Sequence, residues 1–139
     1  MSHVAKYKTS MGTVNKAIFE MALKAAMEDY AKETKGKVVK QVTEGHYDLT
    51  EVMCGVSNNR FRSGIGFRLT NKNEVEMCLQ AYDRDTKDQE EVKGLVQQYY
   101  TLVCTELALR QKGYVVQRQK SANGTWEIVG TMDSVEEFV

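Results

Sequence analysis

Lys35-Gly36-Lys37-Val38-Val39 and Lys112-Gly113-Tyr114-Val115-Val116 are two versions of one motif, and each follows a long stretch with helical periodicity. In both, a glycine can end the helix in the left-handed conformation and a β-branched pair then begins a strand. An extended, apolar segment also precedes each helix. The motif therefore predicts two β-α-β units in tandem, with positive φ at Gly36 and Gly113 and with Val39 and Val116 at matching positions of one sheet.

The predicted order of elements along the chain is β-α-β-β-β-β-α-β-β. The helix over residues 16–35 has one apolar face and a ladder of alternating lysine and glutamate on the other, with Thr13 or Asn15 as its N-cap. The helix over residues 89–112, capped by Asp88, has a wider apolar arc, which fits either a deep position in the core or a partner interface. Asn123-Gly124 predicts a type I′ hairpin turn. Strands are predicted over residues 3–9, 37–42, 47–56, 61–70, 75–82, 114–119 and 125–131.

This order predicts an α+β fold, a ferredoxin-like sandwich with a largely antiparallel sheet. Both long helices are expected on one face, with the other face available, and the C-terminal β-hairpin is expected to extend the sheet. The chain contains no proline and no serine-rich linker. Residues 1–139 are therefore predicted to form a single α+β domain.

The composition narrows the class of protein. The 139 residues are 27% charged and 42% hydrophobic, which is typical of a globular protein. Nineteen basic and nineteen acidic residues cancel, so the chain as a whole has no electrostatic attraction for nucleic acid or anionic lipid. No apolar run approaches the roughly 18–20 residues that span a bilayer. The start, Met1 to Lys6, lacks the apolar core of a secretory signal, so no membrane partner is expected.

Cysteine usage favours a reducing compartment. Cys54, Cys78 and Cys104 are far apart and flanked by apolar residues, as small buried side chains would be. No close pair of cysteines suggests zinc, and Asp83-Arg84-Asp85 lacks the spacing of a calcium loop. His46-Tyr47-Asp48 fits a polar turn better than acid–base catalysis, because no nucleophile accompanies it. The sequence therefore predicts a cytoplasmic protein with no catalytic residue, no metal site and no cofactor.

The segment from Arg60 to Arg68, RFRSGIGFR, has the composition of an RNA-binding strand. Its glycines allow close approach, Phe67 could stack on a base, and Arg60, Arg62 and Arg68 could contact phosphates. The match to the RNA-recognition signature is partial, because Ser63 replaces a cation and Ile65 an aromatic residue. The same residues fit an ordinary strand with a bulge, in which the phenylalanines point inward.

Three stretches resemble a known family. They are the start Met1-Ser2-His3, the run Gly64-Ile65-Gly66-Phe67, and the C-terminal third, from Leu95-Val96-Gln97-Gln98-Tyr99-Tyr100 through Gly113-Tyr114-Val115-Val116 to Asn123-Gly124-Thr125. The chain is similar over most of its length to the family called domain of unknown function twelve-fifty-seven, small soluble proteins of bacteria, plastid genomes and phages. That family has no settled activity, so the resemblance implies cytosolic life and assigns no role to any residue here.

Three functions follow as hypotheses. The first is a non-enzymatic interaction or assembly protein, a homo-oligomer, whose tyrosines, methionines and tryptophan supply interface material. The second is a nucleic-acid-binding protein that uses the Arg60–Arg68 strand. The third is a small-ligand binder or enzyme with a pocket on the open sheet face near His46 and Tyr82, which a self-packed face would argue against.

Overall fold

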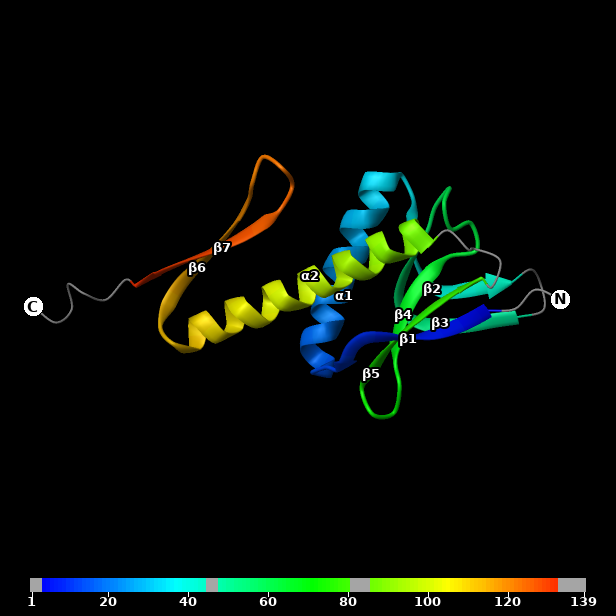
Figure 1. Ribbon diagram of the computed structural model, residues 1–139, viewed down its shortest axis with the longest axis horizontal. Helices are drawn as coiled ribbons and strands as arrows, with labels where there is room; N and C mark the ends of the chain where they lie inside the picture. Colours follow the sequence, from blue (N-terminus) through cyan, green and yellow to red (C-terminus); the bar gives the residue numbers. More distant parts are fainter. Residues whose placement is uncertain (1–3, 45–47, 81–85, 133–139) are drawn as a thin grey trace, which may run out of the picture. The chain divides into compact units, whose positions relative to one another are not determined.

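The computed structural model describes residues 4–44, 48–80 and 86–132, and it confirms the predicted order of elements (Figure 1). The predicted turn at His46 and Tyr47, the loop residues 83–85, and Tyr82 lie outside these residues. The strands are β1 (Val4–Thr13), β2 (Lys37–Glu44), β3 (Asp48–Ser57), β4 (Ile65–Leu69), β5 (Glu74–Gln80), β6 (Tyr114–Lys120) and β7 (Trp126–Met132), and the helices are α1 (Lys16–Thr34) and α2 (Thr86–Gln111).

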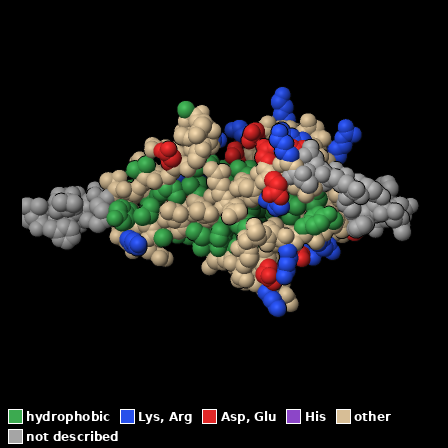
Figure 2. Space-filling view, viewed as in Figure 1, with side chains coloured by type: hydrophobic (Ala, Val, Ile, Leu, Met, Phe, Trp, Pro, Cys, Tyr) green, Lys and Arg blue, Asp and Glu red, His purple; other side chains and the backbone are tan. Residues whose placement is uncertain are grey.

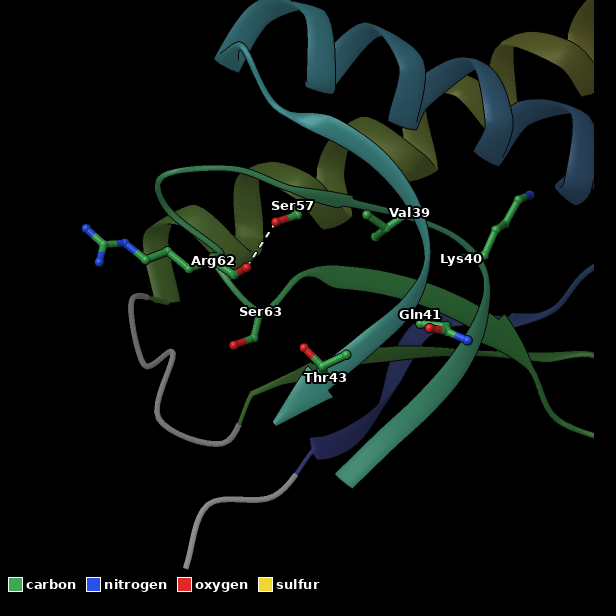
Figure 3. Close-up of a pocket in the computed structure, with 7 residues that line it drawn as sticks. All are labelled: Val39, Lys40, Gln41, Thr43, Ser57, Arg62 and Ser63. Atoms are coloured by element: carbon green, nitrogen blue, oxygen red, sulfur yellow. Dashed lines mark hydrogen bonds between the residues drawn. The ribbon is translucent and has the colours of Figure 1, made fainter. Parts of the chain in front are cut away.

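The chain forms two compact units, residues 1–99 and 100–139, which divide within α2. In the first unit, β1 to β5 form one sheet in the order β1-β5-β4-β3-β2, and all neighbouring strands are antiparallel. The crossover through α1 places β1 and β2 at opposite edges. Helix α1 and the first half of α2 lie on the same side of this sheet (Figures 1 and 3). This part of the prediction, an α+β fold with an antiparallel sheet and two helices, is confirmed.

The core of the first unit lies between these helices and the sheet. Tyr99, in the first half of α2, donates a hydrogen bond from its hydroxyl to Asp29 Oδ2 of α1 at 3.0 Å. Most of the residues on the apolar faces predicted for the two helices are buried, as the 3.6-residue period requires. The most buried side chains of this layer are Phe19, Leu23, Met27 and Tyr30 of α1, Val56, Ile65, Phe67, Met77 and Leu79 of the sheet, and Val92 and Val96 of α2.

Helix α1 begins as predicted but ends one residue differently. Asn15 is the N-cap, and its Oδ1 accepts a hydrogen bond from the Ile18 amide at 3.1 Å. At the other end Lys35, not Gly36, adopts the left-handed conformation, with φ 57°. The Gly36 amide donates to the Ala31 carbonyl at 2.8 Å, which makes Gly36 the residue after the left-handed one in a Schellman motif. The prediction of positive φ is therefore wrong for Gly36 and confirmed for Gly113, whose φ is 90°.

A break in β3 folds the β2–β3 hairpin over the second face of the sheet. The β2–β3 register shifts between Val39 and Gln41. Val39 pairs with Gly55 and Gln41 pairs with Glu51, so two residues along β2 span four residues along β3. Beyond the shift, Val52 packs directly on Gly66, and it joins Val42, Cys78 and Val4 in a small buried cluster. The strong curvature of β2 is visible in Figure 3. The second face, expected to be available, is thus partly covered by the chain's own hairpin.

The second unit contains the end of α2 and the hairpin β6–β7. These two strands form a separate two-stranded antiparallel sheet, so the expectation that the hairpin extends the large sheet is wrong. Val39 and Val116 accordingly lie in different sheets, and the ferredoxin-like arrangement is not confirmed. A hairpin was correctly predicted at Asn123-Gly124, but only Gly124 has positive φ, at 86°. The turn is a three-residue loop closed by the Ser121 amide on the Thr125 carbonyl, rather than type I′.

Helix α2 starts earlier than predicted. It begins at Thr86, so Asp88 lies in its first turn and is not the N-cap. An acidic residue there still stabilises the helix, because it faces the positive end of the helix dipole. None of the helices in the described residues is long and apolar enough to cross a membrane.

Candidate functional site

The segment predicted to contact nucleic acid begins in a loop that is held against α1. Asn58 is buried, and its Oδ1 accepts hydrogen bonds from the amides of Arg60 at 3.0 Å and Phe61 at 2.8 Å. Its Nδ2 donates to Thr34 Oγ1 at 3.0 Å, near the end of α1. One side chain therefore makes the turn and ties it to the helix.

Arg60 is held by groups from both helices. Its Nη1 lies 3.1 Å from Glu91 and 3.8 Å from Asp88, both in the first turns of α2, and 3.5 Å from the Tyr30 hydroxyl of α1. The hydrogen bond to the Tyr30 hydroxyl and the nearby carboxylates of Glu91 and Asp88 raise the pKa of Arg60. The guanidinium is therefore engaged within the protein.

Phe67 and Arg68 also make internal contacts. The Phe67 ring is completely buried in the layer between sheet and helices, and Phe61 is buried as well. Arg68 Nε pairs with Glu76 Oε1 on the neighbouring strand β5 at 2.9 Å. Of the four predicted contact residues, Arg60 and Arg62 are exposed, Arg60 is paired with carboxylates, and no exposed ring at position 67 is available for a base to stack on.

Arg62 lies at the rim of a pocket of about 380 Å³ between the bent edge of β2 and the loop before β4 (Figure 3). The Thr43 amide donates to the Ser63 carbonyl at 3.0 Å and closes one end, and Ser57 Oγ donates to the Arg62 carbonyl at 3.0 Å. In Figure 3 the side chains of Arg62 and Lys40 point away from the centre of the pocket. The lining residues are Val39, Lys40, Gln41, Thr43, Ser57, Arg62 and Ser63.

The pocket therefore has a polar, uncharged interior with two cations at its rim. Lys40 donates from Nζ to the Met53 carbonyl at 2.9 Å. The rim could meet an anion, but the interior presents hydroxyl groups that already bond to neighbouring protein groups, as Ser63 Oγ does to Gln80 Oε1 at 3.2 Å. This arrangement contains no acid–base pair among its lining residues.

The cysteines behave as small core residues in the first unit. Cys54 and Cys78 are buried, and burial raises the pKa of both thiols. Cys104, in the second unit, is half-buried. Within residues 4–44, 48–80 and 86–132, no group of three or more potential ligands could hold a metal ion.

The hairpin of the second unit has two unlike faces. The inner face packs on the end of α2, where Arg118 pairs with the buried Glu106 and where a side chain at Gly130 would touch Leu109. The outer face carries Val115, 49% exposed, and Val129, 39% exposed. On the side shown in Figure 2, hydrophobic side chains gather over the end of α2 and the hairpin, with few charges among them.

The position of Val115 and Val129 on one exposed face follows from the alternation of the two strands, and the sequence reasoning missed it. Alternation within Tyr114–Lys120 and Trp126–Met132 places Val115 opposite Thr131 and Val129 opposite Gln117 on one face. Tyr114, Val116 and Ile128 lie on the other. A strand with apolar residues on both faces, outside a large sheet, must expose one set.

The comparisons with known proteins assign no family: no family model matches, and neither the curated proteins nor the solved structures contain a match. The resemblance to the family called domain of unknown function twelve-fifty-seven stays a prediction.

Proposed function

We propose that this protein is a non-enzymatic assembly protein that forms a homo-oligomer through residues 100–139. The observation that carries the proposal is the hairpin β6–β7, a sheet of two strands that exposes Val115 and Val129 on its outer face. Two-stranded sheets are marginally stable in water unless they gain further packing. A second copy that packs on this hairpin would supply it.

The energy available from this face is modest but useful. Burying a valine side chain completely contributes about 1.5–3 kcal/mol, so covering the exposed part of each contributes roughly 1 kcal/mol. A symmetric dimer gains this contribution from both copies, which doubles it. The outer face also carries uncharged Gln117, Gln119 and Thr131, and Glu127 is its one charged residue.

Light scattering coupled to gel filtration tests the proposal. The expected result is a species larger than the 15.8 kDa chain, which shifts toward monomer on dilution. Replacing Val115 and Val129 together by lysine should give a monomer that keeps the circular dichroism of the parent. The matched control replaces Val38 and Leu49, which are equally exposed in the other unit, and should leave the oligomer intact. A parent protein that stays monomeric at every concentration would refute the proposal.

A second candidate, contact with nucleic acid, is supported by Arg62 and Lys40 at the pocket rim. Filter binding of single-stranded RNA at low salt tests it, because phosphate contacts weaken steeply as salt rises. Arg62→Ala should then lower retention, whereas Lys72→Ala, an exposed lysine in the β4–β5 turn, should change it little. No retention of RNA or single-stranded DNA at low salt would exclude this candidate.

A further inference from the structure

The hairpin has an outer edge on β7 with backbone groups directed away from β6. The hydrogen bond from the Ser121 amide to the Thr125 carbonyl marks residues 121 and 125 as a bonded pair. Because bonded and non-bonded pairs alternate in an antiparallel ladder, residues 127, 129 and 131 direct their amides toward β6. Ile128 and Gly130 therefore direct theirs outward, where no further strand follows in the described chain.

Charge distinguishes the two edges of this small sheet. Strand β6 carries Arg118 and Lys120 and has no acidic residue, whereas β7 carries Glu127 as its one charged residue. Lysine and arginine on an edge strand oppose pairing with another chain, because two such strands bring like charges together. The β7 edge, over Trp126–Met132, is rich in β-forming residues and lacks this protection.

We propose that β7 pairs antiparallel with β7 of a second copy about a twofold axis at Val129, so that two hairpins make one four-stranded sheet. This inference rests on the proposed self-association and names its surface. An axis at the middle residue of Trp126–Met132 pairs the strand over its whole length. Ile128 and Gly130 of one copy then exchange amide–carbonyl hydrogen bonds with Gly130 and Ile128 of the other, which satisfies the outward groups.

The side chains are compatible with this register. Val129 meets its own copy in a non-bonded pair, the closer type, and both valines lie on the exposed outer face. Glu127 lies opposite Thr131 of the other copy, so the two carboxylates are separated by four residues of strand. Moving the axis to position 127 would place the two Glu127 side chains directly opposite each other and shorten the pairing.

Pairing of β7 with β6 of another copy would satisfy the opposite charges but would not close. A head-to-tail contact leaves one free edge at each end and continues into a filament, whereas a twofold contact ends with two chains. The twofold arrangement therefore predicts a dimer and no larger series.

Cysteine crosslinking tests the axis directly. In a Cys104→Ser background, Val129→Cys should form a disulfide-linked dimer under mild oxidation, because Cα atoms of a non-bonded pair lie about 4.5 Å apart, within disulfide reach. Val115→Cys is the matched control, since it is similarly exposed on the same face but lies on β6, and it should remain unlinked. Amide exchange should also slow at Ile128 and Gly130 in the parent relative to a Val129→Lys monomer.

The outcomes separate this inference from the proposed function. A dimer by light scattering that crosslinks at position 115 and not at 129 would overturn the β7 axis and leave self-association standing. A ladder of larger species would favour β6–β7 pairing and overturn the twofold arrangement. A monomeric parent would overturn both.

Discussion

A β-carbon added at Gly66 would meet Val52 at three atoms, Cγ2 at 2.6 Å and Cβ and Cγ1 at 2.9 Å. All three distances are shorter than side-chain carbons approach one another in folded proteins. Val52 is itself buried, because the β2–β3 hairpin folds over the second face of the sheet at this point. Gly66→Ala must therefore push the hairpin away from the sheet or distort β4.

Two opposing effects set the change in the free energy of unfolding that Gly66→Ala should cause. Overpacking a filled core costs about 1–3 kcal/mol, while replacing glycine within a strand returns about 0.5–1 kcal/mol of backbone entropy. The expected net loss is about 1–2 kcal/mol in the free energy of unfolding. With a urea dependence of about 1–3 kcal/mol per molar, the midpoint should fall by roughly 0.5–1 M.

The assay must follow the unit that contains the substitution. Trp126 is the one tryptophan of the chain and belongs to residues 100–139, so its fluorescence reports the other unit. Far-ultraviolet circular dichroism, which follows α1 and the large sheet, should therefore detect the lower midpoint. The matched control is Gly94→Ala in α2, where an added β-carbon meets nothing within 4 Å and should raise stability by about 0.5–1 kcal/mol.

A double substitution identifies the cause. If the clash with Val52 is responsible, Val52→Ala and Gly66→Ala together should cost less than the sum of the two single changes. A Gly66→Ala protein as stable as the parent, or costs that simply add, would refute the folded-over hairpin.

Three further predictions concern the loop, the helix end and the thiols. Asn58→Ala should lower the free energy of unfolding by about 2–3 kcal/mol, because it removes three hydrogen bonds of a buried side chain, whereas exposed Asn59→Ala should change it by less than about 0.5 kcal/mol. Lys35→Gly should raise the free energy of unfolding by about 1 kcal/mol, because it relieves left-handed strain at position 35. Gly36→Ala should lower the free energy of unfolding, because the new β-carbon would lie 2.5 Å from the Ser57 carbonyl oxygen. Changes of the opposite sign in thermal unfolding would contradict the Schellman end of α1. Thiol-specific labelling at neutral pH should modify Cys104 in the folded protein and reach Cys54 and Cys78 only on unfolding, because burial raises their pKa and excludes the reagent; equal labelling of all three would contradict this.

The order of helices and strands could be predicted because each element carries its own period and its own ends. The helix at 16–35 shows a 3.6-residue apolar pattern, and Asn15 supplies the cap that such a pattern needs. The bend of the β2–β3 hairpin could not be predicted, because a register shift moves side chains between faces while the local alternation looks ordinary. The two glycines Gly55 and Gly66 are the sequence feature associated with that bend, because they pair with each other where the hairpin approaches the sheet.

The candidate nucleic-acid segment shows the limit of reasoning from composition. Arg60 and Arg68 resemble free cations in the sequence, but their partners Glu91 and Glu76 come from other elements and are brought close by the fold. Phe67 was predicted either to stack on a base or to point inward, and the strand's alternation places it inward, opposite Cys54 and Met77. Only the pairing of strands decides between these alternatives.

The repeated Lys-Gly-x-Val-Val motif determines the local structure of both copies but not how each copy packs. In both copies the motif ends a helix and starts a strand, because a residue in the left-handed conformation and β-branched residues act within one turn. Gly36 is required by close packing, whereas at Gly113 an added side chain would meet nothing within 4 Å. The first copy therefore joins its helix tightly to the five-stranded sheet, and the second leads into a hairpin with sparse packing. That difference directs attention to β6–β7, a sheet of two strands in the described residues, and it is here that we propose the contact with a second copy.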